Sequence, residues 1–282
     1  MVVKDFFEFK KQKDFLLSVD SDGCVMDTMS VKHNLCFGPC LVEEWELHSC
    51  KEDILALWNK INLYSITRGI NRFKGLAIAL TDINEKYKSI IDVKTFTQWA
   101  ERAPILSNGA LREIIAEQPD KQIFKKALSW SNKVNFAISK LQGEEKLPFP
   151  GTKEALRQAG KWADVALISS ANKQAVIEEW LENGLLDYPD VVMTQNDGSK
   201  SDCIRRLIKS GYDKDKALMC GDSLGDLEAA KQNEIYFFPI IACEEVECWN
   251  RFTTEAFPLF LSHSYGEYEK VNIERFYNKL NK

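Results

Sequence analysis

FLLSVDSDG, residues 15–23, joins a short apolar run to two acidic residues and a glycine. An apolar run of this length followed by polar residues is typical of a buried strand. Because side chains two residues apart on an extended chain point to the same side, Asp20 and Asp22 can share one target. Gly23 allows the backbone to turn sharply behind them. The same residues also suit a β-turn, so this stretch alone leaves a turn and a functional site equally open.

Short apolar runs alternate with helical patterns through the last part of the chain. Together with residues 15–19, the expected strands are 165–168, 191–193, 217–220 and 236–238. The expected helices are 152–160, 173–183, 200–210, 225–232 and a closing helix at 267–281. Alternating strands and helices are typical of βαβ units. The sequence therefore predicts an α/β fold with a parallel sheet covered by helices.

Residues 30–145 have a different pattern. Apolar residues recur there at intervals near 3.6, and no convincing alternating strand is present. Loop-forming residues over 142–151 mark the end of this region. We therefore expect a core formed by residues 1–29 and 146–282, with an all-helical insert at 30–145 that is large enough to be a small domain.

Several other strand ends carry polar residues, because hydroxyls, a lysine and two more acids follow the expected strands. These residues are Ser169, Ser170, Lys200, Asp222 and Asp226. Ligands of open α/β sheets gather where parallel strands end, so these side chains are expected near Asp20 and Asp22. Each also has a simpler explanation: Asp226 suits the dipole at the start of a helix, and a single lysine is usually a solvated charge.

The order of these residues resembles the haloacid dehalogenase superfamily. Its four motifs are D-x-D-G at the first strand, a serine or threonine after the second, a lysine, and G-D-x-x-x-D. They correspond here to Asp20-x-Asp22-Gly23, Ser169, Lys200 and Gly221-Asp222-x-x-x-Asp226. The resemblance covers residues 15–29 and 146–240. It implies a Rossmann-like, doubly wound α/β core with the helical insert as a cap domain.

The resemblance also implies a mechanism. Asp20 would be the nucleophile that forms an aspartyl-phosphate, and Asp22 would be the general acid and base. Members of the family that cleave carbon–halogen bonds or phosphonates lack an acid at the position of Asp22. An alkoxide leaving group needs a proton donor and a halide does not, so Asp22 favours phosphate esters.

The remaining motif residues would serve the metal and the phosphoryl group. Mg²⁺ would be held by Asp20, the main-chain carbonyl of Asp22 and Asp222, with Asp226 orienting water or Lys200 from behind. Ser169, Ser170 and Lys200 would bind the phosphoryl oxygens. Because two neighbouring carboxylates repel each other, a cation between them is also expected from charge alone.

Two arginines in the insert are candidates for binding the substrate. Arg68 and Arg72 lie in residues 67–74, which are expected to form a loop that could bind an anionic or hydroxyl-rich substrate. The alternative is a solvated basic turn, because charged side chains are mostly exposed.

Composition limits the partners and the location. The formal net charge of −5 argues against nucleic acid as a partner. No apolar run approaches the roughly 20 residues that a membrane-spanning helix needs, and no signal peptide is visible. The eight cysteines are expected to be free thiols of a cytoplasmic protein. The expected partner is a small phosphorylated metabolite of unknown identity.

Two alternatives to a phosphatase remain open. One is a phosphosugar mutase resembling β-phosphoglucomutase, although the nearest histidine, His33, is displaced by one residue from the position that the resemblance requires. The other is a phosphate-binding module without turnover. Such modules are much shorter and lack an insert after the first acid, which favours an enzyme.

Overall fold

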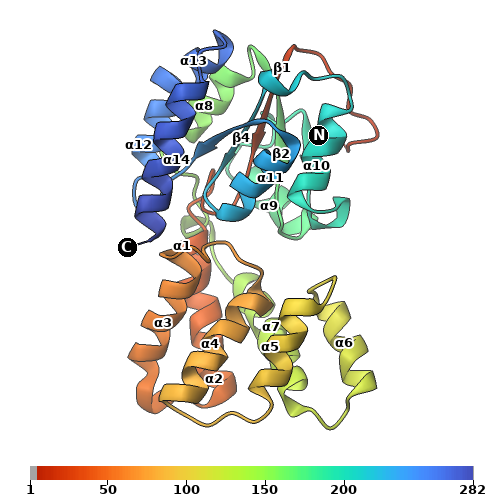
Figure 1. The fold of residues 1–282 in the computed structure, drawn as a ribbon, viewed down its shortest axis with the longest axis vertical. Helices are drawn as coiled ribbons and strands as arrows, with labels where there is room; N and C mark the ends of the chain where they lie inside the picture. The colour runs from red at the N-terminus through yellow and green to blue at the C-terminus, as the bar shows by residue number, and fades with distance from the viewer. Residues whose placement is uncertain (1–4, 282) are drawn as a thin grey trace. The chain divides into compact units, whose positions relative to one another are not determined.

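The computed structural model describes residues 5–281 and contains two compact units (Figure 1). The first, which we call the α/β unit, consists of Met1–Met29 and Gly143–Lys282. The second, the helical unit, is Ser30–Gln142. Each unit has its own hydrophobic core, and the two cores share no residue.

The α/β unit contains a five-stranded parallel sheet in the order β3-β2-β1-β4-β5. Its strands are β1 (Phe15–Val19), β2 (Ala163–Ile168), β3 (Val191–Met193), β4 (Ala217–Gly221) and β5 (Tyr236–Pro239). All five expected strands are therefore present, and the α/β, Rossmann-like fold is confirmed. The central strands read as nearly continuous apolar runs because helices cover both faces of a parallel sheet.

Strand register brings the polar residues to one edge. Val19 at the end of β1 pairs with Leu167 of β2 and with Cys220 of β4, so the three strands end at nearly the same level. The chain proceeds from β1 outward to β2 and β3, then returns to β4 on the other side of β1. The carboxyl edge between β1 and β4 is thus the switch point at which ligands of such sheets bind.

Helices cover the two faces of the sheet. They are α8 (Thr152–Ala159), α9 (Lys173–Glu182), α10 (Lys200–Ile208), α11 (Leu224–Asn233), α12 (Glu245–Arg251), α13 (Phe257–Leu261) and α14 (Gly266–Leu280). Right-handed crossovers place α8 and α9 on one face and α10 and α11 on the other. Helices α10 and α11 pack side by side (Figure 1). Single turns of other helix types are η3 (Gly143–Glu145), η4 (Gln195–Asp197), η5 (Lys214–Lys216) and η6 (Phe252–Ala256).

The helical unit contains no strand in its described residues, 30–142. Its helices are α1 (Met29–Lys32), η1 (His33–Phe37), α2 (Gly38–Trp45), η2 (His48–Cys50), α3 (Lys51–Leu63), α4 (Arg72–Lys86), α5 (Val93–Arg102), α6 (Asn108–Glu117) and α7 (Gln122–Ile138). The loop expected at residues 67–74 ends early, because the Asn71 side chain accepts a hydrogen bond from Phe73 N and starts α4.

Residues 5–14 precede β1 and are attached to the α/β unit, and residues 1–4 lie outside the described part. Phe9 is buried in the core of the α/β unit. Asp164, fully buried at the start of β2, accepts hydrogen bonds from Gln12 N (2.8 Å), Lys13 N (3.0 Å) and the Tyr212 hydroxyl (2.5 Å). The amino-terminal segment is therefore tied to the end of the sheet opposite the polar edge.

The expectation of free thiols is confirmed, since none of the eight cysteines, all of which lie in the described residues, forms a disulfide. Between residues 5 and 281, none of the helices combines the length and the apolar character that crossing a membrane requires.

Candidate active site

Asp20 is the first residue beyond β1 and lies at the carboxyl edge of the sheet. Its backbone N–H donates to Cys220 O of β4 (3.0 Å), so the sheet hydrogen bonding still holds the backbone at this point. The side chain is only 6% exposed, and its Oδ1 lies 2.9 Å from Lys200 Nζ. The chain thus fixes Asp20 through both its backbone and its carboxylate.

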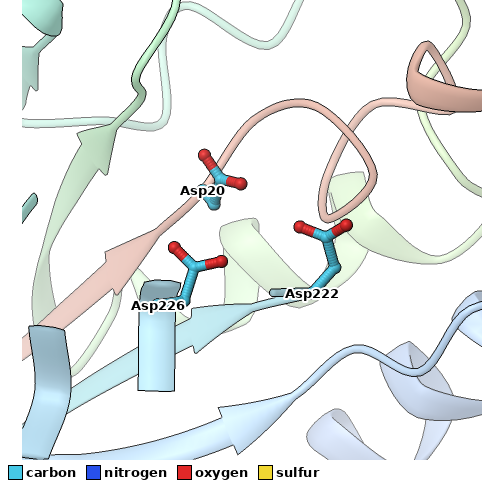
Figure 2. Close-up of side chains that lie close together, drawn as sticks. All are labelled: Asp20, Asp222 and Asp226. Carbon is cyan, nitrogen blue, oxygen red and sulfur yellow. The ribbon is translucent and has the colours of Figure 1, made fainter. Parts of the chain in front are cut away.

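Two further carboxylates lie beside Asp20 (Figure 2). Asp222 directly follows β4, and Asp226 lies in the first turn of α11. One oxygen atom from each of the three aspartates lies within 4.8 Å of the others, and all three residues are buried. The sheet edge therefore concentrates three carboxylates in one small volume.

Asp226 contacts both Lys200 and the first residues of α11. Its Oδ1 lies 2.5 Å from Lys200 Nζ, at the start of α10. Its Oδ2 accepts hydrogen bonds from Ser223 N (3.1 Å) and Ser223 Oγ (2.6 Å), which forms a capping box at the start of α11. One oxygen therefore holds the lysine while the other caps the helix.

Ser223 was not identified from the sequence, although its signal was present. A serine followed three residues later by an acid predicts a capping box, and residues 223–226 have this pattern. A second capping box, between Ser199 and Asp202, starts α10 and so places Lys200 at the site.

The electrostatics of the site follow from burial and like charge. Burial raises the pKa of Asp20 well above its usual range; Lys200 opposes this effect, while Asp226 and Asp222 reinforce it. Burial alone would lower the pKa of Lys200, but Asp20 and Asp226 outweigh it and raise that pKa above its ordinary value. Lys200 therefore stays protonated at neutral pH.

Asp22 is less buried than Asp20 and is oriented by a neighbouring hydroxyl. Thr28 Oγ1 donates a short hydrogen bond to Asp22 Oδ1. Gly23 adopts φ = 80°, a conformation that side chains disfavour, which explains the glycine after the second acid.

Ser169 and Ser170 follow β2 at the same edge of the sheet. Ser169 is buried, and its backbone N–H donates to Met193 O (3.0 Å), which joins it to the end of β3. Its Oγ accepts a hydrogen bond from Ala171 N (3.1 Å), so its own hydroxyl proton can point elsewhere. Ser170 is exposed.

The two candidate arginines belong to the helical unit and do not form a solvated turn. Arg68 is 4% exposed and donates to Leu63 O (2.9 Å). Arg72 donates to Ser131 Oγ (3.1 Å) and Asn135 Oδ1 (2.7 Å), and its guanidinium lies over the Phe37 ring. Burial lowers the pKa of Arg72 to about 10. Their binding of substrate stays a prediction.

His33 also packs within the helical unit. Its ring stacks on Phe37 with centroids 4.7 Å apart, and its Nδ1 accepts a hydrogen bond from Trp58 Nε1 (2.9 Å). These contacts fix the imidazole as part of the packing of that unit. They do not favour the mutase alternative, which needs a histidine available for the substrate.

The donor set at the sheet edge fits a hard divalent cation. Three carboxylates and the Lys200 ammonium leave an excess of negative charge in a buried space. Carboxylate oxygens are the protein ligands that Mg²⁺ prefers. Asp226 has both of its carboxylate oxygens engaged, Oδ1 by Lys200 and Oδ2 by Ser223, whereas Asp20 contacts Lys200 through Oδ1.

The comparisons with known proteins agree with this geometry. A family model described as haloacid dehalogenase-like hydrolase matches residues 51–240. Because this match covers more than half of the chain, the protein belongs to the haloacid dehalogenase-like hydrolase family. The matched range begins after Asp20 and Asp22, and the structure places Asp20 beside the residues that lie within it.

The solved structures that match this chain have low sequence identity to it. One, provisionally assigned as a phosphoglycolate phosphatase from Lactobacillus delbrueckii subsp. bulgaricus, is 17% identical with a TM-score of 0.51, over 80% of this chain and 85% of the other. Another, provisionally a β-phosphoglucomutase from Thermotoga maritima, is 17% identical with a TM-score of 0.45, over 80% and 84%. A haloacid dehalogenase-like family hydrolase from Xanthomonas campestris is 13% identical with a TM-score of 0.46, over 93% and 97%. Among curated proteins, none matches this chain.

Proposed function

We propose that the protein is a Mg²⁺-dependent phosphomonoester hydrolase that acts on a small phosphorylated metabolite through an aspartyl-phosphate on Asp20. The observation that carries the proposal is the convergence of Asp20, Asp222, Asp226 and Lys200 at one buried edge of the sheet. Membership of the hydrolase family supports it.

In the first step, a carboxylate oxygen of Asp20 attacks phosphorus and the bond from phosphorus to the ester oxygen breaks. Asp22, protonated, gives its proton to the departing alkoxide, which leaves as an alcohol. Thr28 orients the Asp22 carboxyl for this transfer. In the second step, Asp22 accepts a proton from water, the water oxygen attacks phosphorus, and the bond to Asp20 breaks to release phosphate.

Three residues would bind the phosphoryl group during both steps. Lys200, held protonated between Asp20 and Asp226, would neutralise charge on the phosphoryl oxygens. The hydroxyls of Ser169 and Ser170 would donate to them. Mg²⁺, when bound by Asp20, the main-chain carbonyl of Asp22 and Asp222, would supply further positive charge at the site.

The helical unit is proposed to act as the cap. In that role its residues, Arg68 and Arg72 among them, would contribute to the choice of substrate. The contacts within that unit do not identify the metabolite.

The test is phosphate release from an aryl phosphate by the purified protein, with Mg²⁺ and with excess chelator. We expect turnover with Mg²⁺ and its loss with chelator. Asp20→Asn should abolish turnover, because the amide is a poor nucleophile and carries no charge. Asp14→Asn is the matched control, since Asp14 is exposed at the opposite end of β1 and should keep wild-type activity.

Absence of phosphate release by the wild type with Mg²⁺ would contradict the proposal and favour a binding module. Incubation with a sugar 1-phosphate separates the remaining alternative. A hydrolase yields free phosphate, whereas a mutase yields the 6-phosphate.

A further inference from the structure

We infer that two buried tryptophans outside the four motifs, Trp180 of α9 and Trp249 of α12, are positioning residues for the loop that carries Asp20 and Asp22. The inference rests on the proposed function for its effect on catalysis. Both indole N–H groups donate directly into this loop, one to a side chain and one to the backbone.

The first anchor is at Ser21, the residue between the two acids. Ser21 is fully buried and lies in the turn that follows β1. Trp180 Nε1 donates to Ser21 Oγ at 2.9 Å, and Trp180 is itself fully buried. This hydrogen bond thus fixes the residue that lies between the two acids.

The second anchor is three residues further along the chain. Trp249 Nε1 donates to Cys24 O at 2.9 Å, and Trp249 is fully buried. Between the anchors the loop closes on itself, because Ser21 O accepts from the backbone N–H groups of Cys24 (3.2 Å), Val25 (3.0 Å) and Met26 (2.9 Å). Fixing Ser21 and Cys24 therefore fixes the whole turn.

Burial alone does not account for these two contacts. Trp45, in the helical unit, is also buried, yet its Nε1 has no hydrogen-bond partner among the described residues. Trp180 and Trp249 instead come from helices remote in sequence and reach the same loop. A rigid aromatic body with one donor at its tip is suited to this task, since packing fixes the donor in space.

The rate of the reaction is sensitive to small displacements of the reacting groups. A reacting group that moves by about 1 Å loses roughly a hundredfold in rate. Trp180→Phe removes the donor and keeps most of the ring. We expect kcat to fall by about ten- to a hundredfold, with KM changed by less than about threefold, because the loop carries the reacting groups. Trp45→Phe, the matched control, should keep wild-type kcat.

A double-mutant cycle separates positioning from stability. Trp180→Phe and Ser21→Ala each leave one buried polar group without a partner, and both should lower Tm. The double variant leaves no such group, so its Tm should recover towards the wild type while kcat stays low. A wild-type kcat in Trp180→Phe, or a kcat that recovers together with Tm in the double variant, would overturn the inference.

Amide hydrogen exchange tests the anchoring without any activity. In Trp180→Phe and in Trp249→Phe, the amides of residues 24–26 should exchange faster than in the wild type, and in Trp45→Phe they should not. If these rates are unchanged, the tryptophans do not hold the loop. Should the wild type release no phosphate, the proposed function fails, while the exchange rates still decide whether the loop is anchored.

Discussion

Gly221 shows how little space surrounds the carboxylates. A β-carbon on this residue would lie 2.3 Å from Asp226 Cβ, 2.3 Å from Asp226 Cγ and 2.6 Å from its Oδ2, all closer than folded proteins tolerate. Position 221 therefore requires glycine because a larger residue would collide with Asp226. This is the side chain that holds Lys200 and caps α11.

Gly221→Ala is expected to push the Asp226 carboxylate away from Lys200. Phosphate release should fall by about a hundredfold, because Lys200 is then displaced from Asp20. The free energy of unfolding should fall by about 1–3 kcal/mol from overpacking. Steady-state kinetics and denaturant unfolding measure the two effects.

Gly225→Ala is the control for this substitution. Gly225 lies in the first turn of α11, the helix that contains Asp226. A β-carbon there would meet only Ser223 Oγ at 3.4 Å, an ordinary contact. Alanine in a helix is favoured over glycine by about 1 kcal/mol, so this variant should be active and at least as stable as the wild type. Equal activity in both variants would show that the close approach to Asp226 has no catalytic role.

The proximity of four site residues could be predicted from the sequence for a physical reason. These residues are Asp20, Lys200, Asp222 and Asp226. Carboxyl ends of parallel strands meet at one edge, so residues that follow the strands converge whatever their separation in the chain. The anchoring of the loop was not predictable in this way. Trp180 and Ser21 are 159 positions apart, and their contact depends on how α9 packs on the sheet.

One predicted strand boundary differs from the structure, at a polar residue that is satisfied by distant segments. β2 begins two residues earlier than the apolar run suggests, because Asp164 is fully buried within it. Its carboxylate is stabilised by backbone N–H groups of residues 12 and 13 and by Tyr212. No local pattern indicates these partners. The other strand starts agree with the structure, since each follows from a continuous apolar run.

At the open edge of the sheet, α14 covers β5. Glu269 Oε1 accepts a hydrogen bond from Phe237 N (2.7 Å), which gives a partner to an N–H group of an edge strand. Burial raises the pKa of Glu269 above its ordinary value of 4.5, although the Phe237 N–H group, Lys231 and Lys270 act in the opposite direction. Ionisation of the carboxyl strengthens this hydrogen bond, but the cost of burying the charge outweighs the gain.

The pKa of Glu269 predicts how stability changes with pH. The folded chain holds this proton more tightly than the unfolded chain does. The protonated carboxyl therefore contributes fully to the free energy of unfolding below the unfolded pKa, and this contribution is lost as the pH rises through the folded pKa. Glu269→Gln removes this dependence and keeps an oxygen acceptor for Phe237 N. As the pH rises from about 4 to about 8, the free energy of unfolding of this variant should therefore increase relative to that of the wild type.

Denaturant unfolding at the two pH values measures this difference. Glu274→Gln, an exposed carboxyl on the same helix, is the control and should show a much smaller change. A difference between Glu269→Gln and the wild type that is independent of pH would show that the Glu269 carboxyl titrates alike in the folded and unfolded chains.

The two units are joined by chain segments that lie side by side. Met26 forms a bridge with Pro148, and Asp27 N donates to Leu147 O (2.8 Å), so the segment leaving the α/β unit and the segment returning to it are hydrogen-bonded to each other. The hydrophobic core of the α/β unit contains no residue of the range 30–142.

Replacing residues 30–142 by a flexible Gly/Ser linker of about six residues should therefore leave the α/β unit folded. The closing segments keep their pairing at residues 26–27 and 147–148, so the linker has only a short distance to span. The shortened protein should unfold in one cooperative transition. The fluorescence of its buried Trp180 and Trp249 measures this transition. A chain that shows no transition, or that binds a dye specific for exposed apolar surface, would mean that the α/β unit needs the helical unit to fold.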